Sequence, residues 1–313
     1  MVPDYFPIIS LISPHGEEVD EYPQIEALCD ELSRQDLRIG RVNLPVHSPD
    51  CKKTRELLTR ENLKNDLLFV SGYCQPGWAR LYLGPQDVLL PAASASAQPS
   101  FFCRHVSDVA GCAERLVTWL GTCMERTELW GCILIGGKSS RMGTPKHLLD
   151  AGNGRSWLEQ SVERLSSQVR KIVLSGEGEV PQSLSSLTRI DDLSGLSGPM
   201  SGIAAAIRAY PHVCWIVMAC DMPDFTVESI RWIMKQRKPG RLAVIPRNPI
   251  TNRGEPLYGW YDYRSVRLFD QLSVFGDVRM NSLGTLNGVY QPLIPDRLLG
   301  AWRNVNRPED LGR

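Results

Sequence analysis

A glycine-rich segment with two cations follows an apolar run near the middle of the chain. Residues 133–135 read Ile-Leu-Ile and lead into Gly136-Gly137-Lys138-Ser139-Ser140-Arg141-Met142-Gly143-Thr144-Pro145-Lys146. Glycines let the backbone approach a ligand closely and turn several N–H groups one way, and Arg141 and Lys146 add positive charge. The segment is therefore a candidate phosphate-binding loop at a strand end. The alternative is an ordinary glycine-rich turn with surface cations.

The tripeptide Gly137-Lys138-Ser139 resembles the end of a Walker A loop, but its context is wrong. That motif requires a glycine five positions before Gly137, where Cys132 stands. The intervening residues form the expected strand, so no loop is left to surround a phosphate. We exclude a P-loop at this position.

Two groups of acids also follow apolar runs. Asp221 comes after residues 214–219, and a carboxylate at a strand end can hold Mg²⁺ against nucleoside phosphates. The alternative is a helix cap, although Thr226 and Asp224 are better placed for that purpose. Asp191 and Asp192 form the second group, and the alternative for them is a solvated acidic turn.

The elements that must position these groups alternate between strands and helices, which predicts an α/β fold. In the C-terminal part we expect strands at residues 132–135, 171–175, 189–191, 214–219, 242–245 and 257–261, and helices at 157–168, 199–210 and 226–235. In the N-terminal part we expect strands at 8–12, 38–43, 67–71 and 79–83, and helices at 25–35, 52–61 and 106–124. Near-continuous apolar strands favour a mostly parallel sheet, whose ligands bind beyond the carboxyl ends of the strands. We place the domains at residues 1–125 and 129–313.

The glycine-rich segment, from Leu134 to Lys146, resembles the signature of the molybdenum cofactor guanylyltransferases, the MobA-like nucleotidyltransferases. Further segments resemble the family in the same order across residues 131–313: Gly198-Pro199-Met200-Ser201-Gly202, Asp221-Met222-Pro223, Pro256-Leu257 and Asn304-Val305-Asn306-Arg307-Pro308-Glu309. The resemblance implies a Rossmann-like nucleotidyltransferase domain. It also implies transfer of GMP from GTP to molybdopterin with release of pyrophosphate.

The resemblance assigns roles to individual residues. Catalytic roles fall on Arg141, Lys146 and Asp221, with Asp221 as the Mg²⁺ ligand. Nucleotide binding falls on Leu134, Ile135, Gly136, Gly137, Lys146, Ser175, Asp192 and Asp221, and acceptor binding on Pro256, Asn304 and Asn306. Asp192 matches the family position better than Asp191, but the choice between them stays open. Ser175 stands where family members often carry an asparagine, which puts a nucleotide contact there in doubt.

The nucleotide and the reaction have alternatives. Related cytidylyltransferases carry Ala-Ala-Gly where this chain has Ile135-Gly136-Gly137, which favours GTP over CTP. The other readings are a CTP:molybdopterin cytidylyltransferase, a sugar-phosphate nucleotidyltransferase or a non-catalytic molybdenum cofactor carrier. The partners implied are GTP, molybdopterin and a recipient molybdoenzyme or its chaperone.

The N-terminal part faintly resembles the MobB-like GTP-binding proteins over residues 8–85. A Walker A loop should follow its first strand, but residues 13–20 read Ser-Pro-His-Gly-Glu-Glu-Val-Asp, with no lysine and three acids. We expect a degenerate accessory domain that does not hydrolyse GTP. The alternative is an unrelated α/β domain.

Composition excludes several classes of protein. The 313 residues carry 35 basic and 35 acidic side chains, so no positive excess supports non-specific nucleic-acid binding. No apolar run reaches the ~18 residues of a membrane span, and the N-terminus lacks the basic start of a signal peptide. Nine cysteines without a Cys-x-x-Cys pair favour the reducing cytoplasm.

Overall fold

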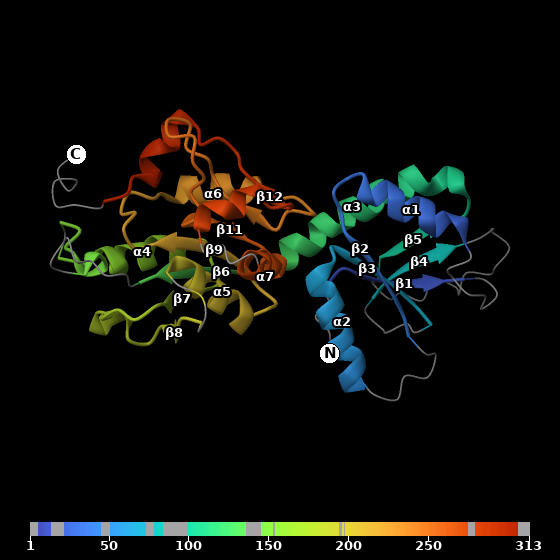
Figure 1. Ribbon diagram of the computed structural model, residues 1–313, viewed down its shortest axis with the longest axis horizontal. Helices are drawn as coiled ribbons and strands as arrows, with labels where there is room; N and C mark the ends of the chain where they lie inside the picture. The colour runs from blue at the N-terminus through green and yellow to red at the C-terminus, as the bar shows by residue number, and fades with distance from the viewer. Residues whose placement is uncertain are drawn as a thin grey trace. The chain divides into compact units, whose positions relative to one another are not determined.

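The computed structural model describes residues 6–13, 22–44, 51–72, 78–83, 99–135, 145–152, 154–193, 196, 198–274 and 279–305. The chain divides into two compact units, one of residues 1–127 with 238–240 and the other of residues 128–237 with 241–313. Each unit contains helices and a sheet that is wholly or mostly parallel (Figure 1). The predicted α/β fold class is confirmed. Within the described residues, no helix combines the length and apolar character needed to cross a membrane.

The first unit is built on a five-stranded parallel sheet in the order β2-β3-β1-β4-β5. The strands are β1 (Ile8–Ile12), β2 (Ile39–Asn43), β3 (Leu67–Ser71), β4 (Ala79–Leu83) and β5 (Ser100–Cys103). The helices are α1 (Pro23–Ser33), α2 (Cys51–Lys64) and α3 (Val109–Arg126), and α1 packs against α3. The place of a Walker A loop, after β1, lies outside the described residues. The MobB-like interpretation of this unit stays a prediction.

Two details of the first unit differ from the expectation. Strand β5 was not expected; it is defined by its pairing with β4. The predicted helix at 106–124 begins as a 3₁₀ turn, Val106–Asp108, and its α-helical part starts at Val109.

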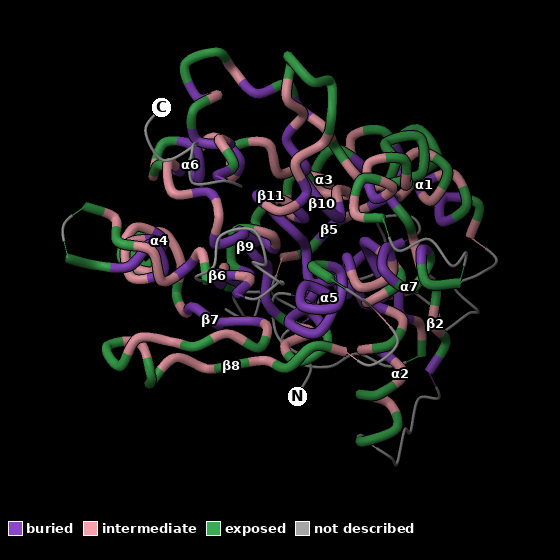
Figure 2. The backbone as a smooth tube through the Cα atoms, turned by 60° about the vertical axis from the view of Figure 1, so that its left-hand side comes forward, coloured by how far each residue is buried: buried purple, intermediate pink, exposed green. Residues whose placement is uncertain are grey.

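The second unit contains a seven-stranded sheet in the order β12-β10-β11-β9-β6-β7-β8. The strands are β6 (Leu129–Leu134), β7 (Lys171–Ser175), β8 (Thr188–Ile190), β9 (Cys214–Ala219), β10 (Ala243–Val244), β11 (Tyr258–Tyr261) and β12 (Val289–Tyr290). Strand β11 runs antiparallel to β9 and β10, and the other pairs are parallel. All six residues of β9 are buried, as expected for a central strand covered on both faces (Figure 2). The two-residue strand β12 was not expected.

Four helices complete the second unit: α4 (Trp157–Ser166), α5 (Pro199–Ala209), α6 (Val227–Lys235) and α7 (Val266–Val274). Helices α5 and α7 share one apolar cluster with the sheet, whereas α6 lies on the opposite side of β11 and β9 (Figure 1). Pro199 occupies the first position of α5, and Thr226 caps α6 by accepting a hydrogen bond from the Ser229 N–H. Both placements were predicted, whereas α7 was missed.

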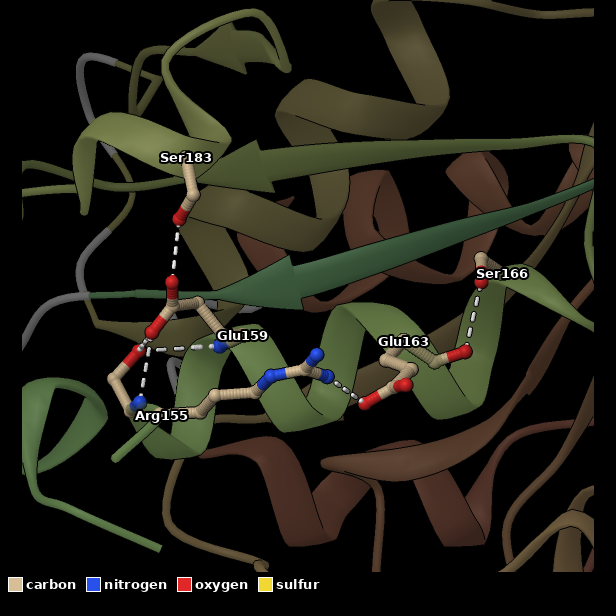
Figure 3. A network of polar contacts seen from close by, with 6 residues as sticks. Arg155, Glu159, Glu163, Ser166 and Ser183 are labelled. Atoms are coloured by element: carbon tan, nitrogen blue, oxygen red, sulfur yellow. Dashed lines mark hydrogen bonds and ion pairs between the residues drawn. The ribbon is translucent and has the colours of Figure 1, made fainter. Parts of the chain in front are cut away.

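Helix α4 begins with a reciprocal cap that also holds a neighbouring turn. The Ser156 hydroxyl accepts from the Glu159 N–H at 3.2 Å, and the Glu159 carboxylate accepts from the Ser156 N–H at 2.8 Å. The same carboxylate accepts from the Ser183 hydroxyl at 2.5 Å (Figure 3). The cap therefore stabilises the start of α4 and fixes the turn before β8 against it.

Candidate active site at the carboxyl edge of the sheet

The centre of the candidate site is an ion pair between two predicted residues. Lys146 lies in a 3₁₀ turn, Lys146–Leu148, and Asp221 lies two residues beyond the end of β9. The Lys146 Nζ is 3.1 Å from the Asp221 Oδ2, and the two side chains are 16% and 20% exposed. These residues are 75 positions apart in the chain, yet β6 and β9 are adjacent strands. The parallel sheet therefore delivers a cation and a carboxylate to one point.

Backbone hydrogen bonds hold the Asp221 turn in place. The Cys220 N–H donates to the Leu134 carbonyl at 3.2 Å, which joins this turn to the end of β6. The Val305 N–H donates to the Asp221 carbonyl at 2.9 Å, which brings the C-terminal segment to the same place. Asn304 therefore lies beside the Asp221 turn and is exposed.

Pro256, the other described acceptor candidate, is buried just before β11. Its carbonyl accepts from the Tyr261 hydroxyl at 2.6 Å, which commits that oxygen to the fold. The next residue, Leu257, accepts through its carbonyl from the Ala219 N–H at 2.8 Å. This segment thus also borders the turn that carries Asp221.

A second group of predicted residues converges on one side of the ion pair. Ser175 ends β7, is 1% exposed, and its hydroxyl has no hydrogen-bond partner among the described residues. A Cβ on Gly202 of α5 would lie 2.7 Å from the Ser175 Oγ, 3.1 Å from the Leu134 Cδ2 and 3.3 Å from the Asp192 Oδ1. Leu134, Ser175 and Asp192 therefore approach α5 at residue 202 more closely than any residue with a Cβ would allow. We call these four residues the Gly202 cluster.

Gly202 was not among the candidate site residues, although its motif was recognised. The spacing Gly-Pro-x-x-Gly was the available signal, since the second glycine falls inside a helix, where this residue costs stability. Its position next to an unpartnered hydroxyl gives the physical reason for the glycine.

The charge of the Gly202 cluster resides on Asp192. Partial burial, and then the neighbouring Glu177 and Asp191 carboxylates, raise the pKa of Asp192 above its usual value. The Asp192 Oδ1 is among the three atoms nearest to the Cβ direction of Gly202, and no atom of Asp191 is. Geometry thus favours Asp192 over Asp191 as the acid of this cluster.

The remaining predicted nucleotide contacts are only partly described. The Ile135 N–H donates to the Ser175 carbonyl at 2.8 Å, so this amide is already committed to the edge of the sheet. Gly136, Gly137, Arg141 and Asn306 lie outside the described residues.

His147, which follows the lysine of the ion pair, was missed by sequence reasoning. It is buried, its Nε2 lies 2.7 Å from the Glu179 carbonyl oxygen, and burial lowers the pKa of its ring. A Cβ on Gly178 would lie 2.8 Å from the His147 Cε1. The ring therefore fastens the Lys146 turn to the segment after β7. A lone histidine without a motif gives no sequence signal for such a role.

The donor set suits a hard cation held jointly with a ligand. The described residues contain no group of three or more His, Cys, Asp or Glu side chains that could enclose a metal ion. Magnesium is commonly bound by one or two carboxylates, together with water and phosphate oxygens of the substrate. Asp221 fits that arrangement, with Lys146 as the adjacent charge.

The family match to known proteins falls within the second unit of the chain. Residues 131–284 match the family described as MobA-like NTP transferase domain. The chain is 30% identical over 190 residues to a "Probable molybdenum cofactor guanylyltransferase" of Pelotomaculum thermopropionicum, covering 58% of this chain and 89% of that protein. It is 29% identical over 195 residues to a "Molybdenum cofactor biosynthesis bifunctional protein" of Synechocystis sp., covering 61% of this chain but about half, 54%, of that protein.

Among solved structures, one similar chain is "Molybdopterin-guanine dinucleotide biosynthesis protein A" from Archaeoglobus fulgidus. It is 25% identical, with a TM-score of 0.49, and the match covers 58% of this chain and 94% of that one.

Proposed function

The chain belongs to the MobA-like NTP transferase family, and on that premise we propose that it transfers GMP from GTP to molybdopterin and releases pyrophosphate. Membership makes the chain a nucleotidyltransferase, and the nucleotide and acceptor are the proposal. The observation that carries it is the 3.1 Å pair of Lys146 and Asp221 at the carboxyl edge of the sheet. The Gly202 cluster lies on one side of this pair and the Pro256 segment on the other.

The reaction is a substitution at the α-phosphorus of GTP. An oxygen of the terminal phosphate of molybdopterin forms a bond to this phosphorus, and the bond to the bridging oxygen of the β-phosphate breaks. The electron pair leaves with pyrophosphate, so no covalent enzyme intermediate is needed. The protein contributes alignment and charge neutralisation, as in other phosphoryl-type transfers.

The two residues of the pair have different roles in this charge neutralisation. Asp221 would hold Mg²⁺, which when bound neutralises charge on the phosphate oxygens. Lys146 places a positive charge beside the same oxygens, and its low exposure strengthens that interaction relative to bulk water. In the ligand-free protein each of the two side chains compensates the charge of the other.

The Gly202 cluster supports guanine as the base. Guanine presents adjacent N1–H and N2–H donors, which match the two oxygens of a carboxylate such as Asp192. Cytosine presents an acceptor, N3, beside its amino group, so a carboxylate would face a lone pair. The buried Ser175 hydroxyl offers a further donor or acceptor. These features favour GTP over CTP.

Pyrophosphate release with Mg²⁺, molybdopterin and each of GTP, CTP, ATP and UTP tests the proposal. We expect release with GTP alone, and loss of it in Lys146→Ala and Asp221→Ala. Release with CTP alone would overturn the base assignment, and full turnover in both variants would overturn the site.

A further inference from the structure

Glu255 is a further carboxylate at the same edge of the sheet, on the other side of the ion pair from Asp192. Glu255 precedes Pro256; its N–H donates to the Pro246 carbonyl at 2.7 Å, and its carbonyl accepts from the Tyr258 N–H at 3.2 Å. The segment is thus fixed by the main chain, and the side chain of Glu255 is not needed to hold it.

The position of Glu255 follows from the pairing of β9 with β11. The Ala219 N–H donates to the Leu257 carbonyl where these antiparallel strands end. Asp221 lies two residues beyond Ala219, and Glu255 lies two residues before Leu257. Both acids therefore stand just past the same strand pair, on neighbouring segments.

The carboxylate of Glu255 has no compensating partner among the residues that the structure describes. The residue is only partly exposed, and burial raises the pKa of its carboxyl, with no neighbouring charge contributing to the shift. No described residue donates a hydrogen bond to it or forms an ion pair with it. A desolvated carboxylate without donors is unfavourable, and a ligand that brings donors would remove that penalty.

The strand order places the two acids on opposite sides of the ion pair. The Asp192 carboxylate belongs to the Gly202 cluster, beside the residues that end β6 and β7, whereas Glu255 precedes β11. The Lys146–Asp221 pair lies near the middle, beyond β6 and β9. Two substrates joined at this pair would therefore extend their rings toward opposite ends.

We propose that Glu255 binds the pterin ring of the acceptor through the ring's adjacent 2-amino and N3–H donors. The inference rests on the proposed function and adds a residue that recognises the acceptor. The 2-amino-4-oxo edge of a pterin offers the same pair of donors as guanine, so two carboxylates can each receive one ring. A carboxylate accepts such a pair with both oxygens, which gives geometric as well as energetic selectivity.

Binding of small fluorescent pteridines to the full-length protein tests this inference without turnover. The probes are pterin, which carries the 2-amino group, and lumazine, which has an oxo group in its place. Titrations use wild-type protein and Glu255→Gln at saturating GTP, so that guanine occupies its own site. The matched control is Glu163→Gln, on the exposed face of α4, where Glu163 accepts only from surface groups such as Arg155 (Figure 3).

We expect wild-type protein to bind pterin more tightly than lumazine. Glu255→Gln should lose about 10- to 100-fold of the pterin affinity, the factor for hydrogen bonds to a charged group, and retain GTP binding. Glu163→Gln should match wild type. Equal affinity for pterin in wild type and Glu255→Gln, displacement of pterin by GTP, or undetectable pterin binding would each overturn the inference.

Steady-state kinetics separate this inference from the proposed function. If wild type releases pyrophosphate with GTP and molybdopterin, Glu255→Gln should raise the KM for molybdopterin and leave the KM for GTP unchanged. An unchanged KM for molybdopterin would refute the role of Glu255 alone. No release by wild type would refute the proposed function, whereas the pterin titration would still report on Glu255.

Discussion

Replacing Gly202 by alanine probes the proposed base site with a single methyl group. The new Cβ would lie 2.7 Å from the Ser175 Oγ, closer than real Cβ contacts come, and 3.1 Å from the Leu134 Cδ2. It would also lie 3.3 Å from the Asp192 Oδ1. The Ser175 hydroxyl must therefore move, although its side chain is buried and short. The methyl group would thus press on both polar residues that are proposed to bind guanine, Ser175 and Asp192.

Two opposing terms set the effect of Gly202→Ala on stability. Removing a glycine from the interior of α5 should stabilise the helix by about 1 kcal/mol. Overpacking against Ser175 and Leu134 should cost about 1–3 kcal/mol. We expect a net loss of up to ~2 kcal/mol from these two terms. Because the methyl group would displace Ser175 and Asp192, the proposed guanine contacts, affinity for GTP should fall by at least about tenfold, equivalent to ~1.4 kcal/mol.

Thermal unfolding and calorimetric titration with GTP measure the two effects. Gly121→Ala in α3 is the matched control, because a Cβ there meets nothing within 4 Å and the variant should gain stability. Adding Ser175→Ala to Gly202→Ala removes the 2.7 Å contact and should restore stability without restoring GTP affinity. If Gly202→Ala behaved like Gly121→Ala and bound GTP normally, the reasoning about the cluster would be refuted.

Five further results are expected. Lys146→Ala should lower kcat by about 10²- to 10³-fold, by analogy with removal of one oxyanion donor, and Asp221→Asn should weaken the dependence of the rate on Mg²⁺; unchanged Mg²⁺ titrations would contradict the metal assignment. Because the pKa of Asp192 is raised, its carboxylate should become protonated at a higher pH than an ordinary aspartate as the pH falls. The KM for GTP should rise over that range of pH, and Asp192→Asn should abolish this rise. The pKa of Glu255 is raised in the folded state. Its favourable contribution to the stability of the fold is therefore complete below the unfolded pKa, and it is lost as the pH rises through the folded pKa. Glu255→Gln should therefore melt above wild type at neutral pH and converge with it at acidic pH. Ser156→Ala should cost about 1 kcal/mol by removing the cap of α4, with the KM values unchanged; a shift in either KM would mean that the cap also positions the site.

The prediction of the strands and the prediction of the ligand-binding edge both depend on long apolar runs that form buried parallel strands. Apolar runs such as residues 214–219 are long and buried on both faces, so their type is visible in the chain itself. Strands β12 and β5 were not predicted. They are defined by their pairing with β10 and β4, and no local pattern of residues identifies those neighbours.

The sequence by itself determined the α/β class and the Lys146 and Asp221 candidates, because residues after parallel strands must gather at one edge. Only the tertiary structure showed that these two side chains meet at 3.1 Å, that Gly202 adjoins Ser175, and that Glu255 is partly buried. Each of those facts depends on which strands are neighbours and on what covers a side chain. Strand order and burial are properties of the packed chain, and no local pattern of residues encodes them.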